Sequence, residues 1–202
     1  MPKFLGHFFI SVIHILYKEK GNFMKIRQLI VSPFLTNCYV LIDGIEAAVI
    51  DPGGETQKII NEVDKNGAIL KYIILTHFHL DHTLSAQEIK KEKVAKIFIH
   101  GDEKNFLKFE PDEFLTEKGE IKIGKTYLEI IHTPGHTKGS ICLLGKGFIF
   151  TGDTLFKDGF GRTDLLGGSP ADLELSLLKL KKIFKTGMKI YPGHGDVFTY
   201  QK

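Results

Sequence analysis

The sequence predicts an α/β protein in which two mixed β-sheets pack face to face and helices cover their outer sides. Short apolar runs of strand length alternate with segments that have helical periodicity, which is the pattern of layered α/β folds. The chain divides into two halves, each with strands and at least one helix, and no linker of distinctive composition separates them. Its 202 residues suffice for one domain with a sizeable core.

The first half of the chain is expected to contain five strands and two helices. The apolar runs predict strands at residues 25–31, 38–43, 47–51, 69–75 and 96–100. Helical periodicity predicts helices near residues 56–65 and 84–93, and Gly67 is placed to end the first of them.

The second half is expected to contain five more strands and one long helix. The strands are predicted at residues 120–123, 127–132, 140–144, 148–151 and 188–191. Ser169 is the expected N-cap of the helix, Pro170 its first residue and Asp172 the partner in a capping box, and Gly187 follows its end. Its apolar stripe, which we expect to face the core, consists of Leu173, Leu177, Leu180 and Phe184.

One segment concentrates side chains that bind metals. Residues 76–82 read Thr-His-Phe-His-Leu-Asp-His and follow the apolar run at 72–75, so they lie where a buried strand ends. Open α/β sheets usually carry their chemistry at that end of their strands. Imidazole and carboxylate together suit zinc, iron or manganese. A single four-coordinate zinc cannot take all these ligands from so short a peptide, which indicates two metal ions.

Three later segments add residues of the same types, again at expected strand ends. Pro-Gly-His turns occur at residues 134–136 and 192–194, and Asp153 follows the apolar strand at 148–151. A glycine before each turn histidine allows the backbone to turn tightly and direct the imidazole inward. The candidate ligands are therefore five histidines and two aspartates: His77, His79, Asp81, His82, His136, Asp153 and His194.

With these motifs in this order, the chain from about Met24 onward resembles the metallo-β-lactamase superfamily, and within it the glyoxalase II-like thioester hydrolases. The resemblance implies a four-layer αββα sandwich. It implies that one metal is held by His77, His79 and His136, that a second is held by Asp81, His82 and His194, and that Asp153 bridges both. Asp51 matches an aspartate that supports the site without binding metal. Class B β-lactamases usually carry another residue at the position of His82, which disfavours that activity.

The resemblance implies a metal-dependent hydrolase that cleaves a thioester such as S-lactoylglutathione. Two divalent ions, with zinc favoured and iron or manganese as alternatives, would share a water molecule and lower its pKa toward neutrality. The catalytic residues would be Asp81 and Asp153, which would orient the hydroxide and accept a proton. A thiolate leaves readily, so little further acid catalysis is needed.

The expected substrate contact is Arg162, nine residues beyond Asp153, where glyoxalase II carries a glutathione-binding lysine. Asp164 stands where that family has a tyrosine, so Arg162 either clamps a substrate carboxylate or pairs with Asp164. The Gly-Arg-Thr-Asp segment at 161–164 also occurs in persulfide dioxygenases of this fold, which use a single iron. That activity, or hydrolysis of a lactone or another ester, is the alternative function. A module that only binds metal is disfavoured, because such a ligand set leaves a coordination position open.

Composition restricts the partners. The formal net charge of +3 comes without a clustered basic stripe, so we expect a small-molecule substrate and no nucleic acid. Cys38 and Cys142 show no CxxC pattern and lie in apolar runs, which predicts buried free thiols and a reducing, cytoplasmic location. His100 and His132 belong to no motif and are expected to have structural or solvent-facing roles.

Residues 1–23 are expected to be an N-terminal extension or to follow a start assigned too early, and residues 24–202 the catalytic domain. The apolar run at residues 4–17 is too short to span a membrane, and no small-residue cleavage site follows it. An interfacial anchor helix is the alternative. His7 and His14, which lie in this run, are not expected to bind metal.

Overall fold

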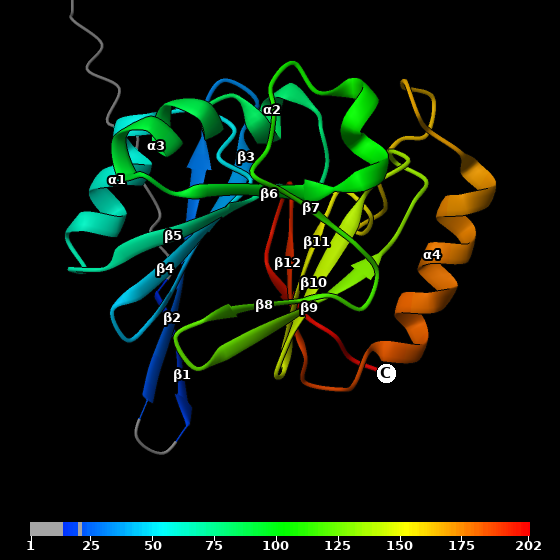
Figure 1. Ribbon diagram of the computed structural model, residues 1–202. Coiled ribbons are helices and arrows are strands. Elements are labelled where there is room, and N and C mark those ends of the chain that lie inside the picture. Colours follow the sequence, from blue (N-terminus) through cyan, green and yellow to red (C-terminus); the bar gives the residue numbers. More distant parts are fainter. Residues whose placement is uncertain (1–13, 20–21) are drawn as a thin grey trace, which may run out of the picture.

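The computed structural model describes residues 14–19 and 22–202. Two mixed β-sheets face each other, with α1 and α3 on the outer side of one and α4 on the outer side of the other (Figure 1). This arrangement confirms the predicted four-layer sandwich. His7 lies outside the described residues.

The first sheet has seven strands, ordered along the sheet as they are along the chain. The first four strands pair antiparallel, and from β4 onward the pairing is parallel. Its strands are β1 (His14–Glu19), β2 (Asn22–Val31), β3 (Thr36–Asp43), β4 (Glu46–Ile50), β5 (Ile69–Ile74), β6 (Lys96–His100) and β7 (Glu113–Leu115).

The second sheet has six strands in the order β13-β12-β11-β10-β9-β8. All its neighbours pair antiparallel except β11 and β12, which are parallel. Its strands are β8 (Glu120–Ile123), β9 (Thr126–His132), β10 (Ile141–Gly145), β11 (Phe148–Gly152), β12 (Lys189–Pro192) and β13 (Phe198–Thr199).

The helices are α1 (Thr56–Asp64), α2 (Leu80–Thr83), α3 (Ala86–Lys93), the 3-10 helix η1 (Gly101–Phe106) and α4 (Pro170–Ile183). The predicted cap of α4 is confirmed, because Ser169 Oγ accepts a hydrogen bond from the Asp172 N–H at 3.3 Å. The predicted stripe also faces inward, with Leu173 and Leu180 buried and Leu177 half-buried. Within the described residues, none of the helices combines the length and apolar composition that crossing a membrane requires.

The core consists of three apolar layers. The middle layer lies between the sheets, where the Tyr39 ring packs 5.1 Å from that of Phe150 and 5.4 Å from that of Tyr191. The outer layers lie between the first sheet and α1 and α3, and between the second sheet and α4. Cys38 and Cys142 are buried and unbridged, as predicted. Because both sheets are anchored on two sides, the loops at their ends start from rigid positions.

Several elements differ from the prediction. Strands β1, β7 and β13 and the helix η1 were not predicted. Strands β7 and β13 have only three and two residues, and β1 lies in the segment that was expected to be an extension. The helix expected at 84–93 begins at Ala86, and α2 precedes it within the histidine-rich segment. The boundary expected at residue 24 falls within β2, which pairs with β1 as far as Arg27 opposite His14. Whether residues 1–23 are dispensable stays a prediction.

Candidate metal centre

All seven predicted ligands meet at one end of the two sheets. His77 and His79 follow β5, and Asp81 and His82 lie on α2. The later ligands come from the β9–β10 turn, the end of β11 and the end of β12, and are His136, Asp153 and His194. Each therefore stands beside a strand end, as predicted, and residues more than a hundred positions apart in the chain come within contact distance.

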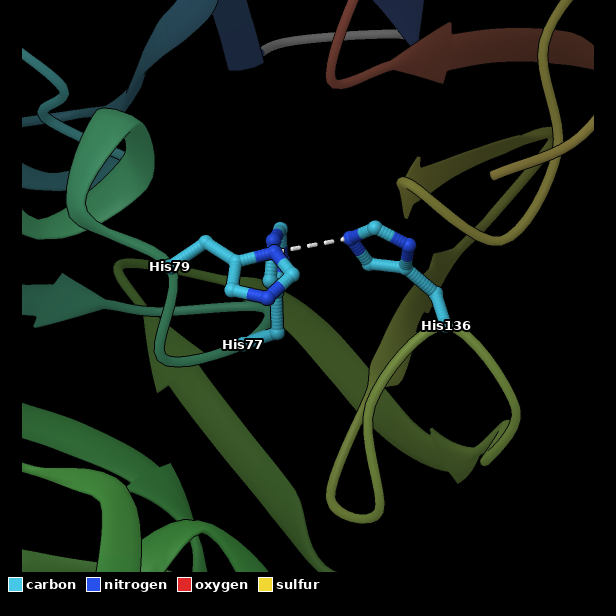
Figure 2. A group of neighbouring side chains, drawn as sticks. All are labelled: His77, His79 and His136. Atoms are coloured by element: carbon cyan, nitrogen blue, oxygen red, sulfur yellow. Dashed lines mark hydrogen bonds between the residues drawn. The ribbon is translucent and has the colours of Figure 1, made fainter. Parts of the chain in front are cut away.

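The first set, here called the trihistidine group, consists of His77, His79 and His136, whose ring nitrogens converge (Figure 2). His79 Nδ1 lies 2.9 Å from His136 Nε2. The three ring centroids lie 4.7–4.8 Å apart, and the ring planes are nearly perpendicular in each pair. Such an arrangement directs in-plane nitrogen lone pairs at one point, which is what a metal ion needs.

The second set, here called the mixed group, consists of Asp81, His82 and His194. His194 Nε2 lies 3.1 Å from Asp81 Oδ2 and 3.3 Å from His82 Nε2. Asp81 and His82 are consecutive residues on the single turn of α2, so one short segment supplies two members of the group. Two imidazoles and a carboxylate form a second donor set suited to a divalent cation.

Asp153 lies between the two groups. Its Oδ1 is 3.4 Å from His82 Nε2 in the mixed group, and its Oδ2 is 3.6 Å from His136 Nε2 in the trihistidine group. Oδ2 is also 3.7 Å from His194 Nε2. One carboxylate thus faces donors of both groups, and its role as a bridging ligand stays a prediction.

Hydrogen bonds behind the rings determine which nitrogen is available. Thr76 Oγ1 donates its only proton to Asp51 Oδ2 at 2.7 Å, so the same oxygen accepts from His77 Nδ1 at 3.1 Å. His136 Nδ1 donates to the Arg162 carbonyl oxygen at 2.7 Å. In both rings the lone pair is therefore on Nε2, which faces the centre, as is usual for metal-binding histidines.

Asp51 supports both groups, in agreement with the role expected for it. Oδ1 accepts the Thr76 N–H at 2.8 Å, and Oδ2 lies 3.0 Å from His82 Nδ1. The residue is buried and has a left-handed backbone with a φ of 52°. Such a conformation is uncommon outside glycine and costs on the order of 1–3 kcal/mol, which marks this turn as specialised.

The residues fit divalent cations. His77 Nε2 and Asp153 Oδ1 are buried and form no hydrogen bond, although buried polar atoms are rarely left unpaired. Burial, together with the neighbouring imidazoles, holds the pKa of His77 well below its usual value and lowers that of His79 to about 4. His77 and His79 are therefore neutral near pH 7 and present lone pairs without first losing protons.

In the mixed group, by contrast, two residues are charged near pH 7: His82 is protonated and Asp81 is ionised. Burial lowers the pKa of His82, but the charges of Asp153 and Asp51 outweigh it and raise the pKa to about 9. Burial raises the pKa of Asp81, but its hydrogen bond with His194 and the charge of His82 lower it to about 2. A cation bound to the mixed group would replace the His82 proton as the positive charge beside Asp51, Asp81 and Asp153.

Neither turn glycine has room for a Cβ atom, and Gly135 also has a positive φ. Gly135 has a φ of 136°, in the region that other residues avoid, as the predicted tight turn requires. Gly193 lies where a Cβ atom would come within 2.2 Å of Asp153 Oδ1 and 2.7 Å of His82 Cε1. The glycine before His194 therefore serves close packing against the ligands.

Comparison with known proteins agrees with this geometry. The profile of the Metallo-beta-lactamase superfamily matches residues 31–194, which include every proposed ligand. The chain belongs to this superfamily. It is 34% identical to the probable metallo-hydrolase YqgX of Bacillus subtilis, over 88% of this chain and 95% of that protein. It is also 34% identical to the hydroxyacylglutathione hydrolase GloC of Haemophilus influenzae, over 87% of this chain and 93% of that protein.

Solved structures of the superfamily share the fold. The BLEG-1 B3 metallo-beta-lactamase superposes with a TM-score of 0.81 and 27% identity, covering 86% of this chain and 93% of that one. TTHA1623, solved in a di-iron-bound form, superposes with a TM-score of 0.78 and 26% identity, covering 85% of this chain and 93% of that one. The protein is therefore a member of a metal-binding, metallo-hydrolase family.

Sequence reasoning missed Glu103, which joins the two loops of the trihistidine group. Glu103 is fully buried in η1. Its Oε2 accepts the N–H of Phe78 at 2.8 Å, and its Oε1 accepts the Thr137 hydroxyl at 2.9 Å and the Gly139 N–H. Phe78 separates His77 from His79, and Thr137 follows His136. Burial raises the pKa of Glu103, and its hydrogen bonds oppose that shift.

Asn37 is a second residue without a sequence signal, and it positions the His194 loop. Its side-chain NH₂ donates to the carbonyl oxygens of Pro192 at 3.0 Å and Gly195 at 2.8 Å. The Tyr39 hydroxyl donates to the same Pro192 oxygen at 2.7 Å. Strand β3 of the first sheet thus holds a ligand loop that follows β12 of the second.

Arg162 pairs with Asp164, which is one of the two roles considered for it. Its exposed guanidinium forms two 2.7 Å hydrogen bonds with Asp164, and its carbonyl oxygen orients His136. Solvent screens an exposed pair of this kind, so a substrate carboxylate can compete for the guanidinium. Substrate binding by Arg162 stays a prediction.

His100 and His132 lie outside the centre and stack on each other, with ring centroids 4.1 Å apart and planes at 16°. Asp102 Oδ2 lies 3.7 Å from each ring. His100 Nδ1 accepts the Asp102 N–H at the start of η1, and His132 Nε2 donates to the Lys138 carbonyl oxygen. The ring nitrogens nearest Asp102 are thus already paired with main-chain groups, which fits the structural roles expected for both histidines.

Proposed function

We propose that the protein is a binuclear metal-dependent hydrolase whose substrates are thioesters such as S-lactoylglutathione. The observation that carries the proposal is Asp153, whose two oxygens face two separate donor groups. The name of the relative GloC, a hydroxyacylglutathione hydrolase, supports this substrate class. The di-iron form of TTHA1623 supports two metal sites in this fold.

The chemistry divides between the metals and the protein. Two divalent cations at these groups would lower the pKa of a shared water and polarise the scissile carbonyl. Asp81 and Asp153 would accept hydrogen bonds from the attacking water and so orient it. In the overall reaction the water oxygen bonds to the acyl carbon and the carbon–sulfur bond breaks. The products are a carboxylic acid and a thiol, between which the water protons are shared.

The leaving group makes thioesters suitable for a site with this set of residues. A thiol has a pKa of about 8.5, so a thiolate departs without prior protonation. The site accordingly needs residues that hold the metal ligands in place and orient them, and Asp51, Glu103 and Asn37 have this role. Zinc is the favoured metal because neutral imidazole and carboxylate both bind it well, and iron and manganese are the alternatives.

A single-iron persulfide dioxygenase is the competing function, supported by the Gly-Arg-Thr-Asp segment at residues 161–164. The two functions differ in metal count and in the use of oxygen. The B3 metallo-beta-lactamase BLEG-1 makes β-lactam hydrolysis a third activity to assay, since this chain shares its fold.

Elemental analysis, run beside assays of thioester hydrolysis, oxygen uptake with a persulfide, and β-lactam hydrolysis, tests the proposal. We expect two metal ions per chain and hydrolysis of S-lactoylglutathione. No more than one ion under saturating zinc, iron and manganese would exclude the binuclear centre. Oxygen uptake without thioester hydrolysis would transfer the assignment to the dioxygenase.

A further inference from the structure

A cavity of about 310 Å³ adjoins the metal centre at His79. His79 directs Nδ1 toward His136 in the trihistidine group, and the same residue lines the cavity. The remaining walls come from α2, the start of α3 and residues 106–109. Its volume is at the lower end of the range of about 300–1,000 Å³ for small-molecule sites. A substrate held at the metals can therefore extend one of its groups into this space.

The cavity walls are apolar and rigid. Phe78 and Phe106 stack with ring centroids 4.8 Å apart at 20°, and both rings line the cavity. Phe78 and Phe109 also pack against the core between the first sheet and its helices, which anchors them. Leu84, another lining residue, leaves 48% of its surface exposed. An exposed leucine beside two anchored aromatic rings forms a preformed apolar surface, which favours an apolar ligand.

The polar groups of the cavity are few, and they do not match a peptide with carboxylates. Among the described residues, no carboxylate lines it, and Lys108 is its one cationic side chain. The Thr83 hydroxyl already donates to the His79 carbonyl oxygen at 3.2 Å. A glutathione moiety, with two carboxylates and an ammonium group, would leave most of its charges unpaired in this cavity.

We propose that this cavity holds the acyl chain of the substrate, so that the preferred thioesters carry an unbranched apolar acyl group of several carbons. This proposal rests on the proposed thioester hydrolysis. It adds that the enzyme selects its substrates by their acyl group. Burying a methylene group favours binding by roughly fourfold. The contact is the same in the ground and transition states, so a longer chain lowers KM and leaves kcat unchanged.

The metal-loaded enzyme is assayed with acyl thioesters of N-acetylcysteamine, from acetyl to octanoyl. We expect kcat/KM to rise roughly two- to fourfold per methylene and to level off once the cavity is filled. Leu84→Glu, which puts a charge on the cavity wall, is expected to remove the rise. The matched control is Leu178→Glu, since Leu178 is a 51% exposed leucine on α4, away from the cavity; it keeps the rise.

Hydrolysis that is independent of chain length, or equally chain-dependent in Leu84→Glu, overturns the acyl-chain proposal and leaves the thioesterase intact. If no thioester is hydrolysed, calorimetry with the non-hydrolysable S-hexyl thioether of N-acetylcysteamine still decides the cavity's role. Binding by the wild type and the Leu178 variant but not the Leu84 variant supports the cavity as an apolar site while the thioesterase fails. Equal or absent binding in all three overturns it.

Discussion

Glu103 offers the most direct test of how the trihistidine group is held together. The variant Glu103→Gln keeps the size of the side chain but replaces one oxygen by an NH₂ group, which donates and cannot accept. In one orientation the NH₂ group faces the Phe78 N–H, and in the other it faces the Gly139 N–H. In either orientation, the N–H of Phe78 or of Gly139 loses its acceptor.

The expected cost follows from the burial of this carboxylate. An unpaired buried N–H costs about 1–3 kcal/mol, and the remaining hydrogen bonds lose the strengthening that a charged acceptor provides. Glu103 is 0% exposed, so solvent does not compensate. We expect the free energy of unfolding to fall by about 2–4 kcal/mol, which for a chain of this length lowers Tm by roughly 5–15 °C. Zinc affinity at the trihistidine group should fall by about 10–100-fold, as when other supporting partners of metal ligands are lost.

Differential scanning calorimetry and zinc titration of the folded variant measure the two effects. Asp102→Asn is the control, because the side chain of its neighbour Asp102 is 59% exposed and should tolerate the change within about 0.5 kcal/mol. A lowered Tm with unchanged zinc affinity would show that Glu103 stabilises the fold without positioning the ligands. An unchanged Tm would refute the energetic argument itself.

Three further predictions concern other parts of the chain. The pKa of His82 is raised to about 9, so zinc binding to the mixed group should release a proton below about pH 9. The zinc affinity of the mixed group should therefore rise by up to about tenfold per pH unit as the pH approaches 9. His79 should release no proton on zinc binding above about pH 6, since its pKa is about 4, and calorimetry in buffers of different ionisation enthalpy measures the protons that zinc releases. Arg162→Ala should raise KM for S-lactoylglutathione roughly tenfold without changing kcat or metal content, and an unchanged KM would end its recognition role. A chain that starts at Met24 should fold and keep its metal and turnover, because no proposed ligand precedes that residue; a large loss of Tm or turnover would show that residues 1–23 are integral.

Local patterns were sufficient for the elements and for the identity of the ligands. Alternation and periodicity report backbone geometry within a few residues, which is why the strand at 96–100 and the Ser169 cap of α4 were predicted correctly. Short edge elements such as β7 contain too few apolar residues for that signal. The motifs could also assign residue types to a metal site, because ligand chemistry belongs to the side chain itself.

By itself the sequence determined the layered fold, the family and the seven candidate ligands. Only the tertiary structure decided how these ligands meet. It places Asp153 between two donor groups and Glu103 behind the trihistidine group. It also shows that the carbonyl oxygen of Arg162 contacts His136. His194 and Asp81 lie 113 positions apart in the chain and 3.1 Å apart in space. Distances of that kind depend on how the two sheets pack on their shared core, and no local pattern of residues encodes that packing.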